Sequence, residues 1–458
     1  MSSRKFNEYK GLDLPQLGRE VLEVWDRENT FGRSITEREG APAFIFYEGP
    51  PSANGLPGIH HVLSRTIKDT ICRYKTQQGY LVRRKAGWDT HGLPVELGVE
   101  KKLGITKEDI GHKISIEEYN RTCREAVMEF TGVWEELTRK MGYWVDMKHP
   151  YITYENKYIE TLWWMLKQLF DKGLLYKGYT IQPYSPAAGT GLSNHELNQP
   201  GCYRDVKDTT CTAQFEIIRD ERSEFLFDDA QGTLYFLAWT TTPWTLPSNT
   251  ALAVGDNIEY VRVKCLNPYT QQPQTVILAK ELLPAYFTPK MEGTYSIGER
   301  IYKGSELVGI RYRQLIDWVK PMGDAFRVIS GDYVTTVDGT GIVHIAPTFG
   351  ADDDRVGKQA GIVPMYVVDR AGKNQPMVDR RGRLFRIEDM DPDFVAKYVD
   401  AERYREWAGR FVKNAYDPSL GPDDPTLDID IAVMLKGEGK AFKIEKHTHS
   451  YPHCWRTD

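Results

Sequence analysis

Apolar and polar positions follow two different periods along the chain. An apolar run at 44–47 leads into a Gly/Pro-rich stretch, and from 59 to 78 apolar residues recur at spacings of three and four. A second short strand pattern, 80–84, runs into the Gly-Trp-Asp sequence at 87–89. Two strands joined through a helix predict a βαβ unit, and therefore a parallel sheet with a right-handed crossover. The first part of the chain is expected to be α/β.

Helical spacing dominates the next part of the chain. The segment 114–176 is expected to be helical, and the tryptophans in its apolar stripe are expected to pack in the core. Another helix is expected to open at Leu14, where Pro15 suits the first turn. The helical pattern at 59–78 places these residues on one face: Leu63, Ile67, Thr70, Ile71 and Tyr74.

The pattern changes near residue 181 to short runs of β-branched and aromatic residues separated by turn residues. This fits a compact β-rich domain, expected to be barrel-like, with helical sequence returning at 393–407. The last segment, 432–458, is expected to be strand and loop of the first domain. The expected strands lie at 212–218, 234–240, 260–264, 275–279 and 341–345.

These patterns predict a β-rich domain inserted into a parallel, Rossmann-like α/β domain. Residues 1–185 would hold an N-terminal helix and the first part of this α/β domain. Residues 186–415 would form the insertion, and residues 416–458 would return to the first domain.

Composition excludes several classes of protein. The 458 residues are 41% hydrophobic and 27% charged, as is ordinary for a globular protein. A net charge of -5 excludes a generally basic nucleic-acid binder, although a local basic groove around 83–85 remains compatible with it. The polar start of the chain leads us to expect no signal peptide, and no apolar run approaches membrane-spanning length. Six scattered cysteines without a Cys-x-x-Cys pair predict reduced thiols in a cytoplasmic protein.

The carboxyl ends of the two predicted strands are the first candidate site. Ligands of parallel sheets bind there, so Gly49-Pro50-Pro51 and Gly87-Trp88-Asp89 should face one crevice. The start of the following helix offers free N–H groups to a phosphate. From the residues alone, an ordinary βα turn with surface histidines, and a helix N-cap for Asp89, remain open.

Five sequence blocks, in order from 47 to 456, resemble the isoleucyl-tRNA synthetases. Valyl and leucyl enzymes share the architecture, but the Asp-Thr-His-Gly-Leu-Pro block is closer to the isoleucyl form. The blocks are Pro-Pro-Ser-Ala-Asn-Gly-Leu-Pro before paired histidines, Gly-Trp-Asp-Thr-His-Gly-Leu-Pro-Val-Glu, Trp-Thr-Thr-Thr-Pro-Trp-Thr-Leu-Pro-Ser-Asn, Gly-Thr-Gly-Ile-Val-His-Ile-Ala-Pro and His-Ser-Tyr-Pro-His-Cys-Trp-Arg.

The resemblance implies that isoleucine is activated by ATP, which binds as a substrate together with Mg²⁺, and that the acyl group is then transferred to tRNA(Ile). It also implies that the parallel, Rossmann-like α/β domain is the first half of the catalytic nucleotide-binding domain. It implies that Asp89 takes the substrate ammonium and that the histidines stabilise the phosphate charge. The implied catalytic residues are Gly58, His60 and His61. The implied amino-acid and ATP-binding residues are Gly49, Pro50, Pro51, Asn54, Asp89 and His91.

The resemblance also implies an editing site in the β-rich insertion. A hydrophobic pocket cannot discriminate isoleucine from valine well enough, because they differ by one methylene, and the isoleucyl enzymes illustrate this limit. A second site therefore hydrolyses Val-tRNA(Ile). Its hydroxyls would position a water and the terminal ribose, and Asp353 would hold the amino group, although a solvated acidic loop is the alternative there. The implied editing residues are Thr240, Thr241, Thr242, Thr245, Asn249, His344 and Asp353.

Three features depart from the family. Gly58 and His60 stand exchanged relative to its His-x-Gly-His motif, and we expect Gly58 to adopt backbone angles forbidden to histidine, giving a remodelled pocket that still takes ATP and isoleucine. The alternative is that the exchange impairs adenylation. Cysteine pairs found in some members are missing around 183–189 and at Thr457, so no zinc or other metal site is expected. The Lys-Met-Ser-Lys-Ser loop is absent, which predicts a partial sequence.

Two other functions are alternatives to an isoleucyl-tRNA synthetase. A free-standing deacylase of misacylated tRNA would not need the Gly-Trp-Asp crevice, and a catalytically dead tRNA-binding fragment would not need the threonine cluster with Asp353. The expected protein is a monomer without membrane contacts.

Overall fold

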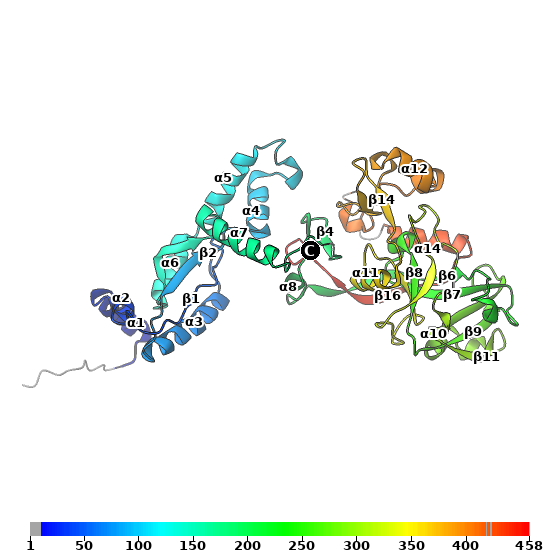
Figure 1. Cartoon of the computed structure of the whole chain (residues 1–458), viewed down its shortest axis with the longest axis horizontal. Helices are drawn as coiled ribbons and strands as arrows, with labels where there is room; N and C mark the ends of the chain where they lie inside the picture. Colours follow the sequence, from blue (N-terminus) through cyan, green and yellow to red (C-terminus); the bar gives the residue numbers. More distant parts are fainter. Residues whose placement is uncertain (1–10, 179, 418, 422–423, 458) are drawn as a thin grey trace, which may run out of the picture. The chain divides into compact units, whose positions relative to one another are not determined.

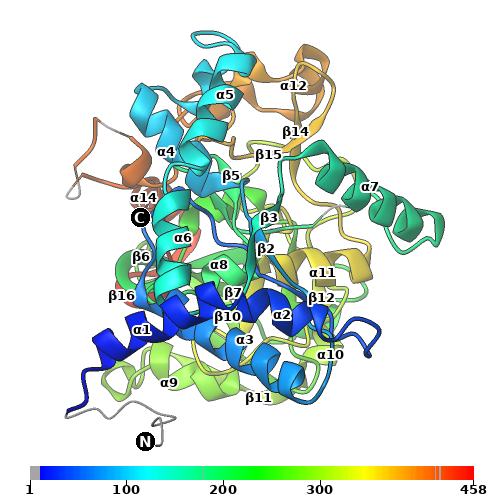
Figure 2. The ribbon, with the colours of Figure 1, turned by 90° about the vertical axis from the view of Figure 1, so that its left-hand side faces the viewer.

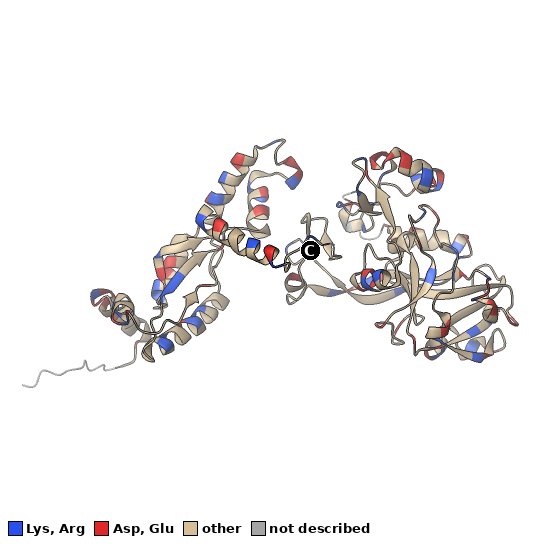
Figure 3. Ribbon diagram, in the orientation of Figure 1, with Lys and Arg blue, Asp and Glu red and all other residues tan. Residues whose placement is uncertain are grey.

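The computed structural model describes residues 11–178, 180–417, 419–421 and 424–457. The chain divides into two compact units, Met1–Gly178 and Tyr179–Asp458, which are coloured blue to green and green to red in Figure 1. Basic and acidic residues are interspersed along the helices of both units (Figure 3), in keeping with the small net charge. Within the described ranges, no helix combines the length and the apolar character needed to cross a bilayer.

Unit 1 is an α/β structure. Its described strands form a three-stranded parallel sheet in the order β1-β2-β3, with β1 at Phe46–Tyr47, β2 at Arg84–Trp88 and β3 at Asp146–Ile152. The helices are α1 Leu14–Arg27, α2 Thr30–Thr36, α3 Ile59–Gln77, α4 Leu93–Leu103, η1 Lys107–Asp109, α5 Ile116–Val127, α6 Thr131–Lys140 and α7 Asn156–Asp171.

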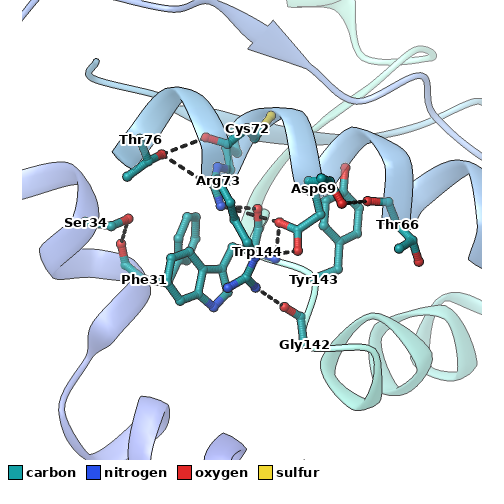
Figure 4. Close-up of polar contacts among 12 residues, drawn as sticks. Phe31, Ser34, Thr66, Asp69, Cys72, Arg73, Thr76, Gly142, Tyr143 and Trp144 are labelled. Carbon is teal, nitrogen blue, oxygen red and sulfur yellow. Dashed lines mark hydrogen bonds and ion pairs between the residues drawn. The ribbon is translucent and has the colours of Figure 1, made fainter. Parts of the chain in front are cut away.

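The N-terminal helices α1 and α2 are fastened to α3 by cationic and aromatic side chains. Arg73 of α3 bonds Asp69 at 2.7 Å and the carbonyl of Gly142 at 2.5 Å (Figure 4). Its guanidinium carbon lies 3.9 Å from the centroid of the Trp144 ring and 4.8 Å from that of Trp25 in α1. Figure 2 shows α1 and α2 lying alongside α3 as a result.

The structure corrects the expectation of continuous helix from 114 to 176. Strand β3 interrupts it, because Pro150 has no N–H to donate within a helix, and the segment pairs in parallel with β2 instead. Strand β2 begins at Arg84, four residues after the predicted start. Arg84 is buried and lies 3.5 Å from Asp69, so a basic groove at 83–85, which the net charge left open, is not formed by three exposed side chains.

Two apolar faces predicted from helical spacing are exposed. No described residue of α7 is buried, and Trp163 and Trp164 are 67% and 63% exposed, so the expectation that its tryptophans are core residues is wrong for this chain. Helix α3 buries Arg65, Cys72 and Thr76 rather than its apolar face. That buried face carries the groups that reach the sheet, since Thr76 accepts a hydrogen bond from Arg84 at 2.8 Å.

Unit 2 is β-rich and contains mixed sheets. Its largest described sheet has the strand order β11-β9-β10-β7-β6-β16, and a smaller one has the order β12-β8-β13. The strands are β4 Tyr184–Ser185, β5 Thr190–Gly191, β6 Tyr203–Glu216, β7 Thr233–Thr240, β8 Ala251–Val254, β9 Glu259–Leu266, β10 Pro273–Ala279, β11 Ser296–Lys303, β12 Arg327–Ser330, β13 Ile342–Ile345, β14 Tyr366–Val368, β15 Asn374–Pro376 and β16 Ala441–Pro452.

Short helices connect these strands. The α-helices are α8 Asn194–Leu197, α9 Leu283–Tyr286, α10 Gly304–Leu307, α11 Ala351–Ala360, α12 Pro392–Tyr398, α13 Ala401–Arg405 and α14 Leu427–Gly437. The 3-10 helices are η2 Glu224–Leu226, η3 Pro243–Ser248, η4 Lys280–Leu282, η5 Pro289–Met291, η6 Ile387–Asp389 and η7 Asn414–Tyr416.

The last strand, β16, pairs antiparallel with β6 along most of its length, from Ala441 opposite Ala213 to Pro452 opposite Tyr203. One large core cluster runs from these strands to α13 and α14. The α/β and β-rich characters are thus confirmed, while barrel closure, a Rossmann-like arrangement and the three domain limits stay predictions.

Gly87 in β2 is packed closely against the ring of Tyr151 in β3. A Cβ at this position would overlap the ring of Tyr151, whose hydroxyl is tied to the carbonyl of Glu48 at 2.5 Å. Replacing Gly87 with alanine is expected to lower the free energy of unfolding by about 1–3 kcal/mol in urea titrations. The matched change Gly98→Ala in α4, where a Cβ meets nothing within 4 Å, should be neutral or stabilising by up to about 1 kcal/mol. Equal effects of the two changes would contradict the prediction.

Candidate functional site

The first site begins where α3 begins. Gly58 is the N-cap residue, and its N–H donates to Nδ1 of His61 at 2.8 Å. The ring of His61 also packs edge-on against Trp134, with centroids 4.7 Å apart. Burial, then His60, Arg65 and Lys68, lower the pKa of His61. At neutral pH the ring is therefore neutral with its proton on Nε2, which leaves Nε2–H as a donor at the helix start.

The structure corrects the reason why a glycine stands at position 58. Its φ is -102° and its ψ is 170°, an extended conformation that any residue adopts. A Cβ there would instead lie 2.8 Å from Cε1 and 2.9 Å from Nδ1 of His60. The exchange of glycine and histidine is self-consistent because the ring of His60 occupies the space that a Cβ at position 58 would need; its centroid lies 3.8 Å from that of the His61 ring, and the two rings are tilted by 43°.

The two predicted strand-end motifs do lie together. The N–H of Asp89 donates to the carbonyl of Pro51 at 3.0 Å, and Ser52 and Asp89 form a parallel bridge. Pro51, Asn54 and Asp89 are half-buried, while Gly49 and His91 are exposed. Nδ1 of His91 lies 3.0 Å from the hydroxyl of Thr153. The half-buried carboxylate of Asp89 therefore lies beside the Gly-Pro-Pro turn, where its oxygens can accept hydrogen bonds from an ammonium ligand.

Sequence reasoning missed a buried carboxylate at the base of this site. Glu48 is 2% exposed and accepts short hydrogen bonds from Lys68 and from the hydroxyl of Tyr143. The hydroxyl of Tyr151 donates to the carbonyl of the same residue. The glutamate precedes Gly49, so these contacts hold the Gly-Pro-Pro turn. An acidic residue at the end of an apolar strand was the only signal in the sequence.

The second site lies in unit 2, where the Thr-rich turn meets β13. The hydroxyl of Thr245 donates to the carbonyl of Thr242 at 2.9 Å and accepts from Nε2 of His344 at 3.0 Å. Nδ1 of His344 is then a buried acceptor without a partner among the described residues. The hydroxyl of Thr240 accepts the N–H of Thr242 at 3.1 Å. Hydroxyls, and no activated nucleophile, line this turn.

Asp353 and Asn249 have different surroundings. Asp353 lies in the first turn of α11 and accepts from the N–H of Ala346 at 2.9 Å and from the hydroxyl of Tyr333 at 3.2 Å. Burial raises the pKa of Asp353. Its oxygens keep further lone pairs for a cation. Asn249 is buried and its amide is held by core groups, including the hydroxyl of Tyr312 at 2.7 Å, so its contacts are structural.

The free energy of unfolding should depend on pH because the ring of His344 is buried. Burial lowers its pKa from 6.5 to about 4, so between these values the unfolded chain binds a proton that the native ring does not. Stability contributed by the neutral ring is therefore lost as pH falls from 6.5 towards 4, by up to about 1.4 kcal/mol per pH unit. Urea unfolding at pH 7.5, 6 and 5 should show a smaller loss on acidification for His344→Gln than for the parent. Parallel pH dependences would contradict this.

The amino-acid sequence of this chain is similar to those of known proteins. Residues 20–391 match the family described as tRNA synthetases class I (I, L, M and V). The chain belongs to this family. An isoleucine–tRNA ligase of Bacteroides fragilis is 63% identical over 469 residues, covering 100% of this chain and 41% of the relative, and one of Porphyromonas gingivalis is 62% identical with the same coverage. One of Clostridium tetani is 42% identical over 98% of this chain and 38% of its own length.

This class I synthetase chain therefore spans about two fifths of the length of these relatives. A solved structure titled "The crystal structure of GlLeuRS-CP1" covers 52% of this chain and 99% of its own, at 15% identity and a TM-score of 0.33, too low to carry an argument.

The two segments at which no zinc site is expected, 183–189 and 454–457, lie together in this chain. The hydroxyls of Ser185 and Thr457 are 3.4 Å apart, and both lower the pKa of the Cys454 thiol, against burial, which raises it. Within the described ranges, no group of three His, Cys, Asp or Glu side chains is arranged to hold a metal ion. The donor set here is one thiol with two hydroxyls, which does not fit a structural zinc site.

Proposed function

We propose that this chain is the N-terminal portion of an isoleucine–tRNA ligase that activates isoleucine with Mg-ATP and transfers it to tRNA(Ile). The observation that carries the proposal is 63% identity over the whole chain to a protein of that name. The matched portion contains both candidate sites. The partners are then tRNA(Ile), isoleucine and ATP with Mg²⁺ as substrate, and the protein is expected to be a cytoplasmic monomer.

In unit 1 the residues divide the work of adenylation. Asp89 binds the ammonium of isoleucine, and Gly49 and Pro50 line the amino-acid pocket over the turn that Glu48 anchors. Nε2–H of His61 stabilises the charge that develops on the phosphate, with His60 beside it. The edge of a parallel sheet with a helix N-terminus supports a Rossmann-like, nucleotide-binding half-domain.

In unit 2 we propose the editing of Val-tRNA(Ile). The hydroxyls of Thr240, Thr241, Thr242 and Thr245 position a water and the terminal ribose, and Asp353 holds the misplaced amino group. His344 acts through Thr245, because its Nε2–H orients that hydroxyl. The proposed limits of this inserted, barrel-like domain are 186–415. Residues 416–458 are proposed to return to the domain that carries adenylation, while α14 and β16, which they contain, pack in unit 2.

The test uses the full-length protein that contains this chain. Isoleucine-dependent exchange between ATP and pyrophosphate, together with hydrolysis of Val-tRNA(Ile), is the expected result. Hydrolysis without exchange would show a deacylase, and absence of both would show a tRNA-binding fragment; either would overturn the proposal. Exchange without hydrolysis would remove the editing half.

A further inference from the structure

A cluster of buried charges in unit 2 belongs to neither site. Nζ of Lys413 lies 3.1 Å from Oδ2 of Asp208 in β6 and 3.2 Å from Oδ2 of Asp428 in α14. Nε2 of His449 in β16 lies 3.2 Å from the same Asp208 oxygen. The side chain of Asp428 is 1% exposed, and those of the other three are 15–20% exposed. Buried ion pairs contribute little net stability, so this cluster calls for another role.

Asp428 reaches from this cluster to the Thr-rich turn. Its Oδ1 accepts the N–H of Trp244 at 2.8 Å. Trp244 is the second residue of η3, and the first, Pro243, has no N–H. The side chain of the N-cap residue, Thr242, makes no capping bond. The donor that a helix start leaves unpaired is therefore satisfied from outside, by a carboxylate of another helix.

The anchored turn carries two of the hydroxyls that are proposed to position the water and the ribose in editing. Thr242 immediately precedes η3 and Thr245 lies within it, joined by the N–H of Thr245 to the carbonyl of Thr242 at 3.0 Å. Burial raises the pKa of Asp428 to about 6 although Lys413 opposes the shift. Without the ammonium of Lys413, the carboxylate would be a buried unpaired charge.

We propose that Asp428, held in its charged form by Lys413, is a positioning residue of the editing site that caps η3 and fixes the hydroxyls of Thr242 and Thr245. This inference rests on the proposed editing function. Asp208 in β6 also contacts Lys413, and His449 in the neighbouring strand β16 contacts the same Asp208 oxygen.

The test compares Asp428→Ala with Asp428→Asn in the full-length protein. Asparagine keeps an oxygen that can accept the Trp244 N–H, whereas alanine removes it. We expect alanine to lower kcat for Val-tRNA(Ile) hydrolysis by about tenfold with KM within about twofold, and asparagine to restore most of it. Isoleucine-dependent ATP–pyrophosphate exchange, which belongs to unit 1, should not change. Asp430→Ala, in the same helix, is the matched control.

Amide hydrogen exchange of the peptide 240–249 gives a readout that needs no editing activity. It should accelerate about tenfold in Asp428→Ala and remain near the parent rate in Asp428→Asn. Lys413→Met should impair hydrolysis, and the added change Asp428→Asn should partly restore it by removing the unpaired charge. Unchanged hydrogen exchange, an unchanged kcat in Asp428→Ala, or equal loss with alanine and asparagine would each overturn the inference. A parent protein without hydrolysis would overturn the editing function instead.

Discussion

Asparagine in place of His61 is expected to slow isoleucine-dependent ATP–pyrophosphate exchange by about 10²–10³-fold. The amide oxygen of asparagine can still accept the N–H of Gly58, as Nδ1 does now at 2.8 Å. The side chain no longer reaches as far as Nε2, so the donor offered to the phosphate is lost. The loss should appear mainly in kcat, because the interaction strengthens as charge develops.

Stability separates this effect from damage to α3. The variant loses the contact with the His60 ring and the edge-on contact with Trp134, the latter worth about 1 kcal/mol, so urea unfolding should shift modestly. His61→Ala, which loses the cap as well, should be both inactive and less stable. Exchange within threefold of the parent in the asparagine variant would remove His61 from the proposed adenylation site.

Removing the carboxylate of Asp353 is expected to lower kcat/KM for Val-tRNA(Ile) hydrolysis by about 10²-fold. In Asp353→Ala the substrate amino group loses its anion, and the N–H of Ala346 and the hydroxyl of Tyr333 lose their acceptor. Exchange of ATP and pyrophosphate should persist, so the full-length variant should form and release mischarged Val-tRNA(Ile). Steady-state mischarging measures that outcome directly.

Asp352 provides the matched control, because it is the adjacent residue in α11 with an exposed side chain. It is 64% exposed and pairs with Arg355 at 3.2 Å at the surface. Asp352→Ala should hydrolyse Val-tRNA(Ile) within about threefold of the parent, since exposed pairs contribute little. If both variants lost hydrolysis equally, a disturbed α11 rather than a specific carboxylate would be responsible.

Sequence by itself determined the class of the chain and the residues worth testing. Strand, turn and helix periods were sufficient for the α/β start and the β-rich second part, because the spacing of apolar positions differs between a helix and a strand. The ordered motifs led to the family that the comparisons then showed. The contact between Asp89 and the Gly-Pro-Pro turn followed from the rule that the carboxyl ends of parallel strands share one edge.

Only the tertiary structure decided what those residues touch. Glu48 became an anchor because Lys68 and Tyr143, distant in sequence, converge on it, and no local pattern encodes such a meeting. The exposed faces of α3 and α7 escaped prediction because spacing shows that a stripe is apolar without showing what covers it. Gly58 owes its place to the ring of His60 rather than to its own backbone angles, a steric fact that exists only once the side chains are placed.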